Sequence, residues 1–183
     1  MSDPPVILDL CSGTGAWSQP YADAGYDVRR VDVLHGDDVR HRRYSPSPVH
    51  GILAAPPCTH LASSGARWWA EKGEAALLDA LAVVDACLRA VVVEHPVWWA
   101  LENPVGRLVN YLGQPVLRFD PCDYGDPWTK RTCLWGSFVL PAKAPVEPRK
   151  PNPIHHMPPS AERSQLRSVT PAGFTMAFFE ANP

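Results

Sequence analysis

Short apolar runs alternate along the chain with mixed stretches of helical periodicity. The first run, at residues 6–10, stops at a Cys-Ser-Gly-Thr-Gly sequence, which is typical of a buried strand ending in a glycine turn. Further runs predict strands at 26–32, 51–55, 98–102, 116–119 and 132–135, and helices at 16–24, 75–93, 105–112 and 171–182. Such alternation indicates an α/β fold with a doubly wound, mostly parallel sheet.

The composition changes near residue 141. Residues 1–140 carry the alternating elements and are predicted to form one catalytic domain. Residues 141–159 are rich in Pro, Lys and His, and helical periodicity returns where Phe174, Ala177 and Phe178 follow an i, i+3, i+4 pattern. We therefore expect 141–183 to be a Pro-rich segment and a C-terminal helix that pack back on the same domain. A chain of 183 residues is long enough for one domain of this kind.

Glycines and acidic residues that could bind a ligand follow the predicted strands at their carboxyl ends, where ligands bind in a doubly wound sheet. Gly13 and Gly15 follow the first strand and allow close approach of a nucleotide-like cofactor. Asp32 ends the second strand and is placed to accept hydrogen bonds from ribose hydroxyls. Of the two acids that follow, Asp38 or its neighbouring backbone is expected to face an adenine, while Asp37 is interpreted as part of a solvated turn.

Cys58 is the predicted nucleophile. It follows two prolines directly after a buried strand, and prolines hold a side chain in a fixed position. A thiol near a helix start can have a lowered pKa, and the thiolate is the reactive form. Glu102 ends another apolar strand, where an acid needs a partner or a function; the alternative is a helix-capping acid. The other cysteines, at 11, 87, 122 and 133, are interpreted as small apolar residues.

Taken in order, these motifs resemble those of the cytosine-5 DNA methyltransferase family. Asp9 to Gly15 is similar to its cofactor motif, Asp32 and Asp38 match acids of its second and third motifs, and Ala55-Pro-Pro-Cys58 resembles its nucleophile loop. Glu102-Asn-Pro is similar to its Glu-Asn-Val motif, and residues 124–131 resemble its Tyr-Gly-x-Pro-Gln-x-Arg-x-Arg segment. The resemblance covers residues 6 to 136.

This resemblance implies a Rossmann-like fold that binds S-adenosyl-L-methionine and methylates carbon 5 of cytosine in DNA through a covalent cysteine adduct. The target cytosine would be flipped or single-stranded. The implied catalytic residues are Cys58, Glu102, Asn103 and Arg131. The implied cofactor-binding residues are Asp9, Cys11, Ser12, Gly13, Gly15, Trp17, Asp32, Val33, Asp38 and Pro56.

The chain departs from the family pattern in four places, one of which is Ala55, where the family usually has glycine before Pro-Pro-Cys. Cys11 stands where the family usually has Phe, so the aromatic contact to the cofactor is expected either to be missing or to be supplied by Trp17. Only Lys130 and Arg131 remain of the arginine motif. About 47 residues follow Gly136, where the family places a large recognition domain, so we expect little or short sequence specificity. Residues 162–168, with the terminal helix, are the candidate counterpart of the family's final motif.

Charge leaves the substrate open. The formal net charge is -2, so phosphate binding would depend on a local patch. The available cations include Arg40, Arg42, Arg43, Lys130, Arg131, Arg149, Lys150, Arg163 and Arg167. Alternatives are methylation of cytosine in RNA or in a free nucleotide, and a non-catalytic cofactor- or nucleic-acid-binding subunit of a split methyltransferase with a separate recognition subunit. Trp68 and Trp69, in a predicted lid, either stack on a base or cap the core.

The remaining features exclude other classes of protein. Five cysteines without a CxxC pair predict free thiols and no metal, and the adjacent His155 and His156 are interpreted as a loop pair. We therefore expect the cytoplasm of a bacterium or of a virus-infected host cell. No apolar run approaches the ~20 residues of a membrane span, so no membrane association is expected.

Overall fold

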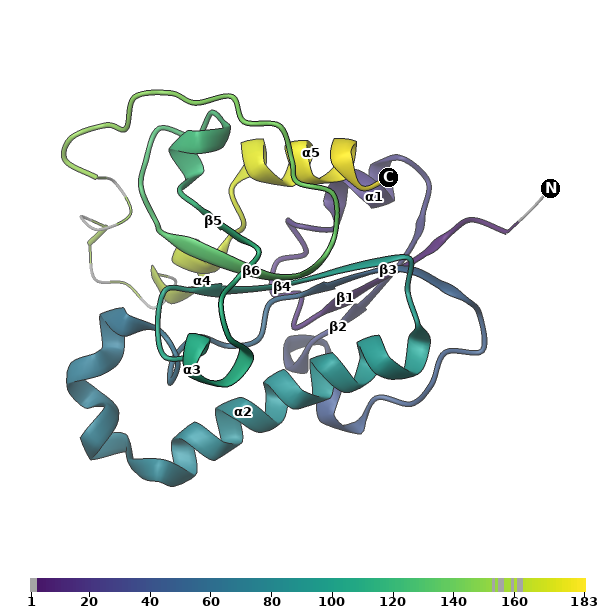
Figure 1. Cartoon of the computed structure of the whole chain (residues 1–183), viewed down its shortest axis with the longest axis horizontal. Helices are drawn as coiled ribbons and strands as arrows, with labels where there is room; N and C mark the ends of the chain where they lie inside the picture. Colours follow the sequence, from purple (N-terminus) through teal and green to yellow (C-terminus); the bar gives the residue numbers. More distant parts are fainter. Residues whose placement is uncertain (1–2, 153, 155–156, 159, 161–162) are drawn as a thin grey trace.

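The computed structural model describes residues 3–152, 154, 157–158, 160 and 163–183. A six-stranded sheet lies between two helical layers (Figure 1). The strands are β1 (Val6–Leu10), β2 (Asp27–Val31), β3 (Val49–Ala54), β4 (Trp98–Pro104), β5 (Leu117–Phe119) and β6 (Thr132–Ser137), in the order β2-β1-β3-β4-β6-β5. The first four are parallel, and β6 runs antiparallel between β4 and β5. The predicted α/β, doubly wound, mostly parallel sheet is confirmed.

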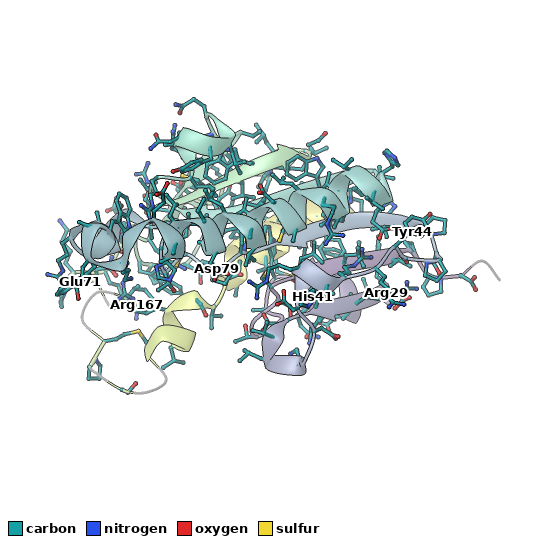
Figure 2. The ribbon with its side chains drawn as sticks, turned by 90° about the horizontal axis from the view of Figure 1, so that it is seen from below. Arg29, His41, Tyr44, Glu71, Asp79 and Arg167 are labelled. Carbon is teal, nitrogen blue, oxygen red and sulfur yellow. The ribbon has the colours of Figure 1, made fainter. Side chains whose placement is uncertain are left out.

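Helices cover both faces of this sheet. They are α1 (Gln19–Asp23), α2 (Trp69–Glu94), α3 (Val109–Leu112), α4 (Arg163–Ser168) and α5 (Ala172–Ala181). In Figure 1, α2 and α3 lie on one side of the sheet, and α1 and α5 lie on the other. Figure 2 looks at the α2 side, with Glu71 and Asp79 labelled on α2 and Arg167 on α4.

Successive residues of the central strands enter different cores. Leu8 and Leu10 of β1 pack with α2, whereas Ile7 belongs to an aromatic core beneath α5. The same alternation places Ile52 of β3 on the α2 side and Leu53 on the other. Strands buried on both faces read as continuous apolar runs, which explains why these strands were visible in the sequence.

The long helix and the first helix differ from their predicted bounds. The long helix begins at Trp69 and is broken at Gly73, whose φ of 74° and ψ of 179° are open to glycine but not to a helical residue. The first helix spans only five residues, with Pro20 in its first turn. Residues 163–168, assigned no separate helix, form α4.

The C-terminal helix packs against the start of the chain. Phe174 and Phe178 are fully buried, and Trp17 lies 6.1 and 5.6 Å from their ring centroids. The hydroxyl of Tyr21 donates to the carbonyl oxygen of Asn182 at 2.8 Å. The division into domains at residue 140 stays a prediction. Among the described residues, no helix combines the length and apolar character needed to cross a bilayer.

Candidate functional site

A cavity of about 880 Å³ opens at the carboxyl ends of β1, β2, β3 and β4. The predicted site residues that line it are Asp9, Cys11, Ser12, Gly13, Trp17, Asp32, Val33, Asp38, Pro56, Cys58 and Glu102. Gly15, Asn103 and Arg131 are not part of this lining. Parallel strands end at one edge of the sheet, so residues scattered over about 90 positions of sequence are collected around one space. We call this space the main cavity.

Asp32 fixes the glycine turn at one end of the main cavity. Its Oδ2 accepts a hydrogen bond from the backbone N–H of Gly13 at 2.8 Å, and its Oδ1 accepts one from Leu34 at 2.9 Å. The turn begins at Cys11, whose φ is 55° and whose N–H donates to the carbonyl oxygen of Val31. Because a carboxylate can accept further bonds, Asp32 remains able to bind a ligand hydroxyl while it holds the turn.

Asp9 lies at the base of the turn and is fully enclosed. Its Oδ2 accepts from the Ser18 hydroxyl at 2.5 Å. Burial raises the pKa of Asp9 to about 6, and the Ser18 hydrogen bond and the Arg30 charge only partly oppose this. Gly15 serves packing here: a Cβ at this position would meet the Arg30 guanidinium at 2.4 Å, and its φ of 72° already favours glycine.

Two polar atoms in the wall of the main cavity lack partners. Ser12 Oγ and Trp17 Nε1 are both buried and have no hydrogen-bond partner within the described parts of the chain. Both atoms are enclosed by protein and are not exposed to the cavity, although other atoms of the two residues line it. Asp32 is therefore the polar group suited to a nucleoside-type ligand, and the volume falls in the range of ligand pockets.

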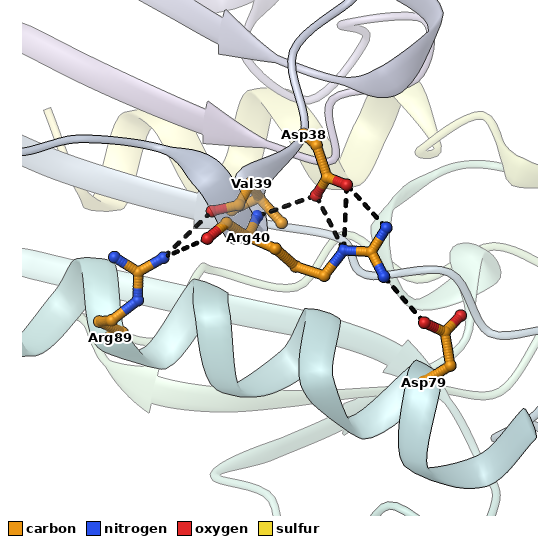
Figure 3. A network of polar contacts seen from close by, with 5 residues as sticks. All are labelled: Asp38, Val39, Arg40, Asp79 and Arg89. Carbon is orange, nitrogen blue, oxygen red and sulfur yellow. Dashed lines mark hydrogen bonds and ion pairs between the residues drawn. The ribbon is translucent and has the colours of Figure 1, made fainter. Parts of the chain in front are cut away.

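The turn that follows Asp32 is tied to α2 by an ion-pair network (Figure 3). The Arg40 guanidinium contacts Asp38 at 2.7 Å and Asp79 of α2 at 2.8 Å, and Arg89 donates to the Arg40 carbonyl oxygen at 2.9 Å. The hydrogen bonds from Arg40 lower the pKa of Asp38 to about 2. The Asp38 carboxylate is thus occupied by Arg40, although the residue still lines the main cavity. Its contact with an adenine stays a prediction.

Cys58 and Glu102 face the same cavity from the ends of β3 and β4. The buried Asn103, next to Glu102, donates through Nδ2 to the Pro56 carbonyl oxygen at 2.9 Å. This bond joins the strand that carries the acid to the proline pair that carries the thiol. Asn103 therefore positions the loop and does not contact a ligand in the main cavity.

The pKa values of the thiol and the acid are both raised. Burial, and then the charge of Glu102, raise the pKa of Cys58, while Lys130 and Arg167 act in the opposite direction. Burial also raises the pKa of Glu102, opposed by Lys130. The expectation of a lowered thiol pKa is therefore wrong, because Cys58 is enclosed beside a carboxylate and is not exposed at a helix start. A protonated Glu102 is a hydrogen-bond donor.

Arg107 holds the loop after Cys58, and the sequence reasoning missed it. Its Nε donates to the His60 carbonyl oxygen at 2.8 Å, its N–H donates to that of Leu61 at 2.9 Å, and its guanidinium lies 4.5 Å from the Trp69 ring centroid. Gly106 pairs with Ala62 in an isolated bridge. The segment that follows Glu102 thus contacts the nucleophile loop at two places. Gly106 and Arg107 contact residues 60–62, after Cys58, and Asn103 contacts Pro56, before it. We call these contacts the loop clasp.

The two tryptophans of the predicted lid have different surroundings. Trp69 is half-buried beneath Arg107, so it belongs to the loop clasp. Trp68 is 48% exposed, and the Arg67 guanidinium lies 5.2 Å from its ring centroid. Trp69 is not among the described members of either hydrophobic core, and Trp68 is not among the described lining residues of the main cavity, so both interpretations of this pair stay predictions.

Arg131 lies in a neighbouring space of about 490 Å³, which we call the second cavity. Its Nε pairs with Asp120 at 2.7 Å. The lining consists of Ser63, Ser64, Val105, Asp120, Thr129, Lys130 and Arg131. Lys130 and Ser64 also line the main cavity, so the two spaces adjoin. Lys130, and not Arg131, is the cation that acts on Cys58 and Glu102.

The C-terminal segment contributes to the main cavity. Ser160, Arg167, Ser168 and Thr170 line it, and the equivalence of residues 162–168 to the family's final motif stays a prediction. Glu162 of that segment, and the pair His155 and His156, lie outside the described residues. The sequence did not predict that these residues line the cavity, because an irregular stretch precedes them.

Comparisons with known proteins extend the description of the fold. No protein-family model matches the chain, and no curated protein does. Among solved structures, the chain is similar to a candidate DNA modification methyltransferase encoded within an E. coli prophage, with a TM-score of 0.52 and 17% identity. The match covers 85% of this chain and 56% of the other. The chain therefore has a Rossmann-like methyltransferase fold and spans little more than half the length of that neighbour.

Proposed function

We propose that this chain methylates carbon 5 of cytosine in DNA, with S-adenosylmethionine as methyl donor and Cys58 as covalent nucleophile. The observation that carries the proposal is that Cys58 and Glu102, from different strands, line the same cavity as the glycine turn and Asp32. A nucleophile, an acid and a nucleoside-type subsite in one space are the parts that this reaction needs.

The turn and its neighbours would hold the cofactor. Asp32 would accept hydrogen bonds from the ribose, and Ser12 and Trp17 line the cavity beside it. The backbone of the turn, open at Gly13, allows close approach. When bound, S-adenosylmethionine supplies an electrophilic methyl group.

The residues at the other end would activate the cytosine ring. Carbon 5 is a poor nucleophile until Cys58, after its thiol proton is lost to solvent, bonds through sulfur to carbon 6, which sends the ring electron pair towards carbon 5. Glu102, whose pKa is raised by burial, would in its protonated form donate to ring N3 and stabilise the charge that develops. After methylation, loss of the carbon 5 proton to solvent expels the Cys58 thiolate and restores the aromatic ring, and the thiolate can then be protonated again. Asn103 and Arg107 keep the sulfur in position throughout.

DNA is favoured over a free nucleotide by charge and by analogy. The cations Arg67, Lys130 and Arg167 line the main cavity, and phosphate contacts supply much of the affinity for nucleic acid. The structural neighbour from the E. coli prophage is described as acting on DNA. The alternative of a non-catalytic subunit is opposed by the presence of both Cys58 and Glu102.

The test is incubation with labelled S-adenosylmethionine and single-stranded DNA, duplex DNA, RNA or dCMP, followed by nucleoside mass spectrometry. We expect 5-methylcytosine from DNA, and a stable covalent complex when 5-fluorocytosine replaces the target. Cys58→Ala should abolish the complex, whereas Cys122→Ala, which removes a half-exposed thiol remote from the cavity lining, should not. Absence of 5-methylcytosine from every substrate would refute the proposal.

A further inference from the structure

We propose that the second cavity binds the phosphate-linked nucleotide next to the target cytosine, so that the smallest efficient substrate is a single-stranded dinucleotide. The inference rests on the proposed function and deepens it, because it names the unit of substrate that the enzyme recognises. Its basis is that the second cavity is lined by two cationic side chains and three hydroxyl-bearing side chains and adjoins the main cavity.

Lys130 connects the two spaces. It lines both, it acts electrostatically on Cys58 and Glu102, and it has no ion-pair partner among the residues that the structure describes. A cation shared by the two spaces is placed where the phosphodiester between two neighbouring nucleotides would lie if the target base occupied the main cavity. An unpaired ammonium on this border is accordingly a phosphate-binding group.

The second cavity remains net positive although it contains a carboxylate. The Asp120 carboxylate already has a partner, because its Oδ2 accepts from Arg131 Nε at 2.7 Å. One of the two cations is thereby neutralised, and the charge of Lys130 is left for a ligand. The terminal guanidinium nitrogens of Arg131, on a side chain that is 60% exposed, remain free to donate to phosphate oxygens.

Hydroxyl donors complete the set. Thr129 Oγ1 accepts a hydrogen bond from Asn152 Nδ2 at 2.7 Å, which leaves its own O–H able to donate to a ligand. Ser64 lies on the border with Lys130, whereas Ser63 donates to the Val105 carbonyl oxygen and is not free to donate elsewhere. An ammonium, a guanidinium and two hydroxyls around one space match the acceptor oxygens of a phosphodiester and a sugar.

The lining also indicates that the second cavity does not recognise the identity of the neighbouring base. No aromatic ring is among its described lining residues, and Val105 is its single apolar side chain. The volume of about 490 Å³ falls within the range of small-ligand pockets. Contacts to phosphate and sugar position a strand without reading its sequence, so we expect weak preference for the neighbouring base.

The experiment compares methyl transfer to deoxycytidine, dCMP, d(CpT) and d(TpC), with a single-stranded 12-mer as the reference substrate. We expect kcat/KM for at least one dinucleotide to exceed the values for deoxycytidine and for dCMP by tenfold or more, mainly through a lower KM. Replacing the neighbouring thymine by adenine should change kcat/KM less than threefold.

Variants assign the gain to the second cavity. Thr129→Val should lower the ratio of dinucleotide to deoxycytidine kcat/KM several-fold, and Arg131→Met should do the same. Ser137→Ala, at an exposed position of β6 outside both cavities, should leave the ratio unchanged. Equal kcat/KM for dinucleotides and deoxycytidine, with active methylation of the 12-mer, would overturn the subsite. Failure to methylate even the 12-mer would instead refute the proposed function.

Discussion

The loop clasp can be opened by adding one carbon atom, in Gly106→Ala. A Cβ at Gly106 would lie 2.0 Å from the Leu61 carbonyl oxygen and 2.8 Å from Ala62 Cα. Both are backbone atoms, so neither can rotate away as the end of a flexible side chain can. The segment after Glu102 and the nucleophile loop must therefore move apart.

The cost follows from the contacts that this movement breaks. The Leu61 carbonyl oxygen loses the Arg107 N–H, a neutral backbone bond of about 0.5–1.5 kcal/mol. The bond from Arg107 Nε to His60 contributes about 1.5–3 kcal/mol if it is lost as well. We expect the free energy of unfolding to fall by about 2–4 kcal/mol, and methyl transfer to fall on the order of 100-fold, because displacement of a nucleophile by about 1 Å has that effect.

The assay is urea denaturation, read as the midpoint and slope, together with methyl transfer to DNA. Gly65→Ala is the matched control in the same loop, because its Cβ would meet only the Thr59 carbonyl oxygen at an ordinary 3.6 Å. Gly65→Ala should change the free energy of unfolding by no more than about 0.5 kcal/mol. If the two variants are equally stable and equally active, the loop clasp does not hold the loop.

Three further perturbations test the electrostatics of the main cavity. Because burial keeps the Cys58 thiol protonated, kcat/KM should rise with pH above neutrality, and Lys130→Gln should move this rise to higher pH; an unshifted profile would place Lys130 out of reach of the thiol. The folded-state pKa of Asp9 is about 6, against an ordinary 3.8, so the free energy of unfolding should fall as pH rises from about 4 to 6 and stay lower above pH 6. Asp9→Asn should flatten this dependence and, in thermal melts at pH 7.5, stabilise the protein by up to about 3 kcal/mol. Asp32→Ala removes the acceptor for Gly13, so calorimetry should show weaker binding of S-adenosylmethionine than Asp37→Ala does; equal affinities would remove Asp32 from the site.

The strand ends were predictable because burial on both faces leaves a clear signature. A run such as Val-Ile-Leu at the start of β1 has no polar face, and a parallel sheet brings the ends of such runs to one edge. Glycines, prolines and acids after those runs then had to meet. The direction of β6 was not predictable in this way, because an apolar run carries no information on whether its neighbour is parallel or antiparallel.

The cations of the site show a limit of a different kind. Lys130 and Arg131 are adjacent in the segment before β6, and both line the second cavity. Sequence therefore identifies the pair but not the member that also lines the main cavity, which is Lys130, whereas Arg131 pairs with Asp120. Arg107 had no signal at all, because its contacts are to backbone oxygens of a loop that lies some 45 residues away in the chain.

The aromatic core gives the last helix a part in ligand binding. Trp17 faces the main cavity on one side and rests on Phe174 and Phe178 of α5 on the other. A molecule seated on Trp17 resists any opening of the chain that would draw α5 away, since that opening would also remove its seat. Amide protons in α5 should consequently exchange with solvent more slowly when the cavity is filled, although that helix supplies none of the cavity's lining.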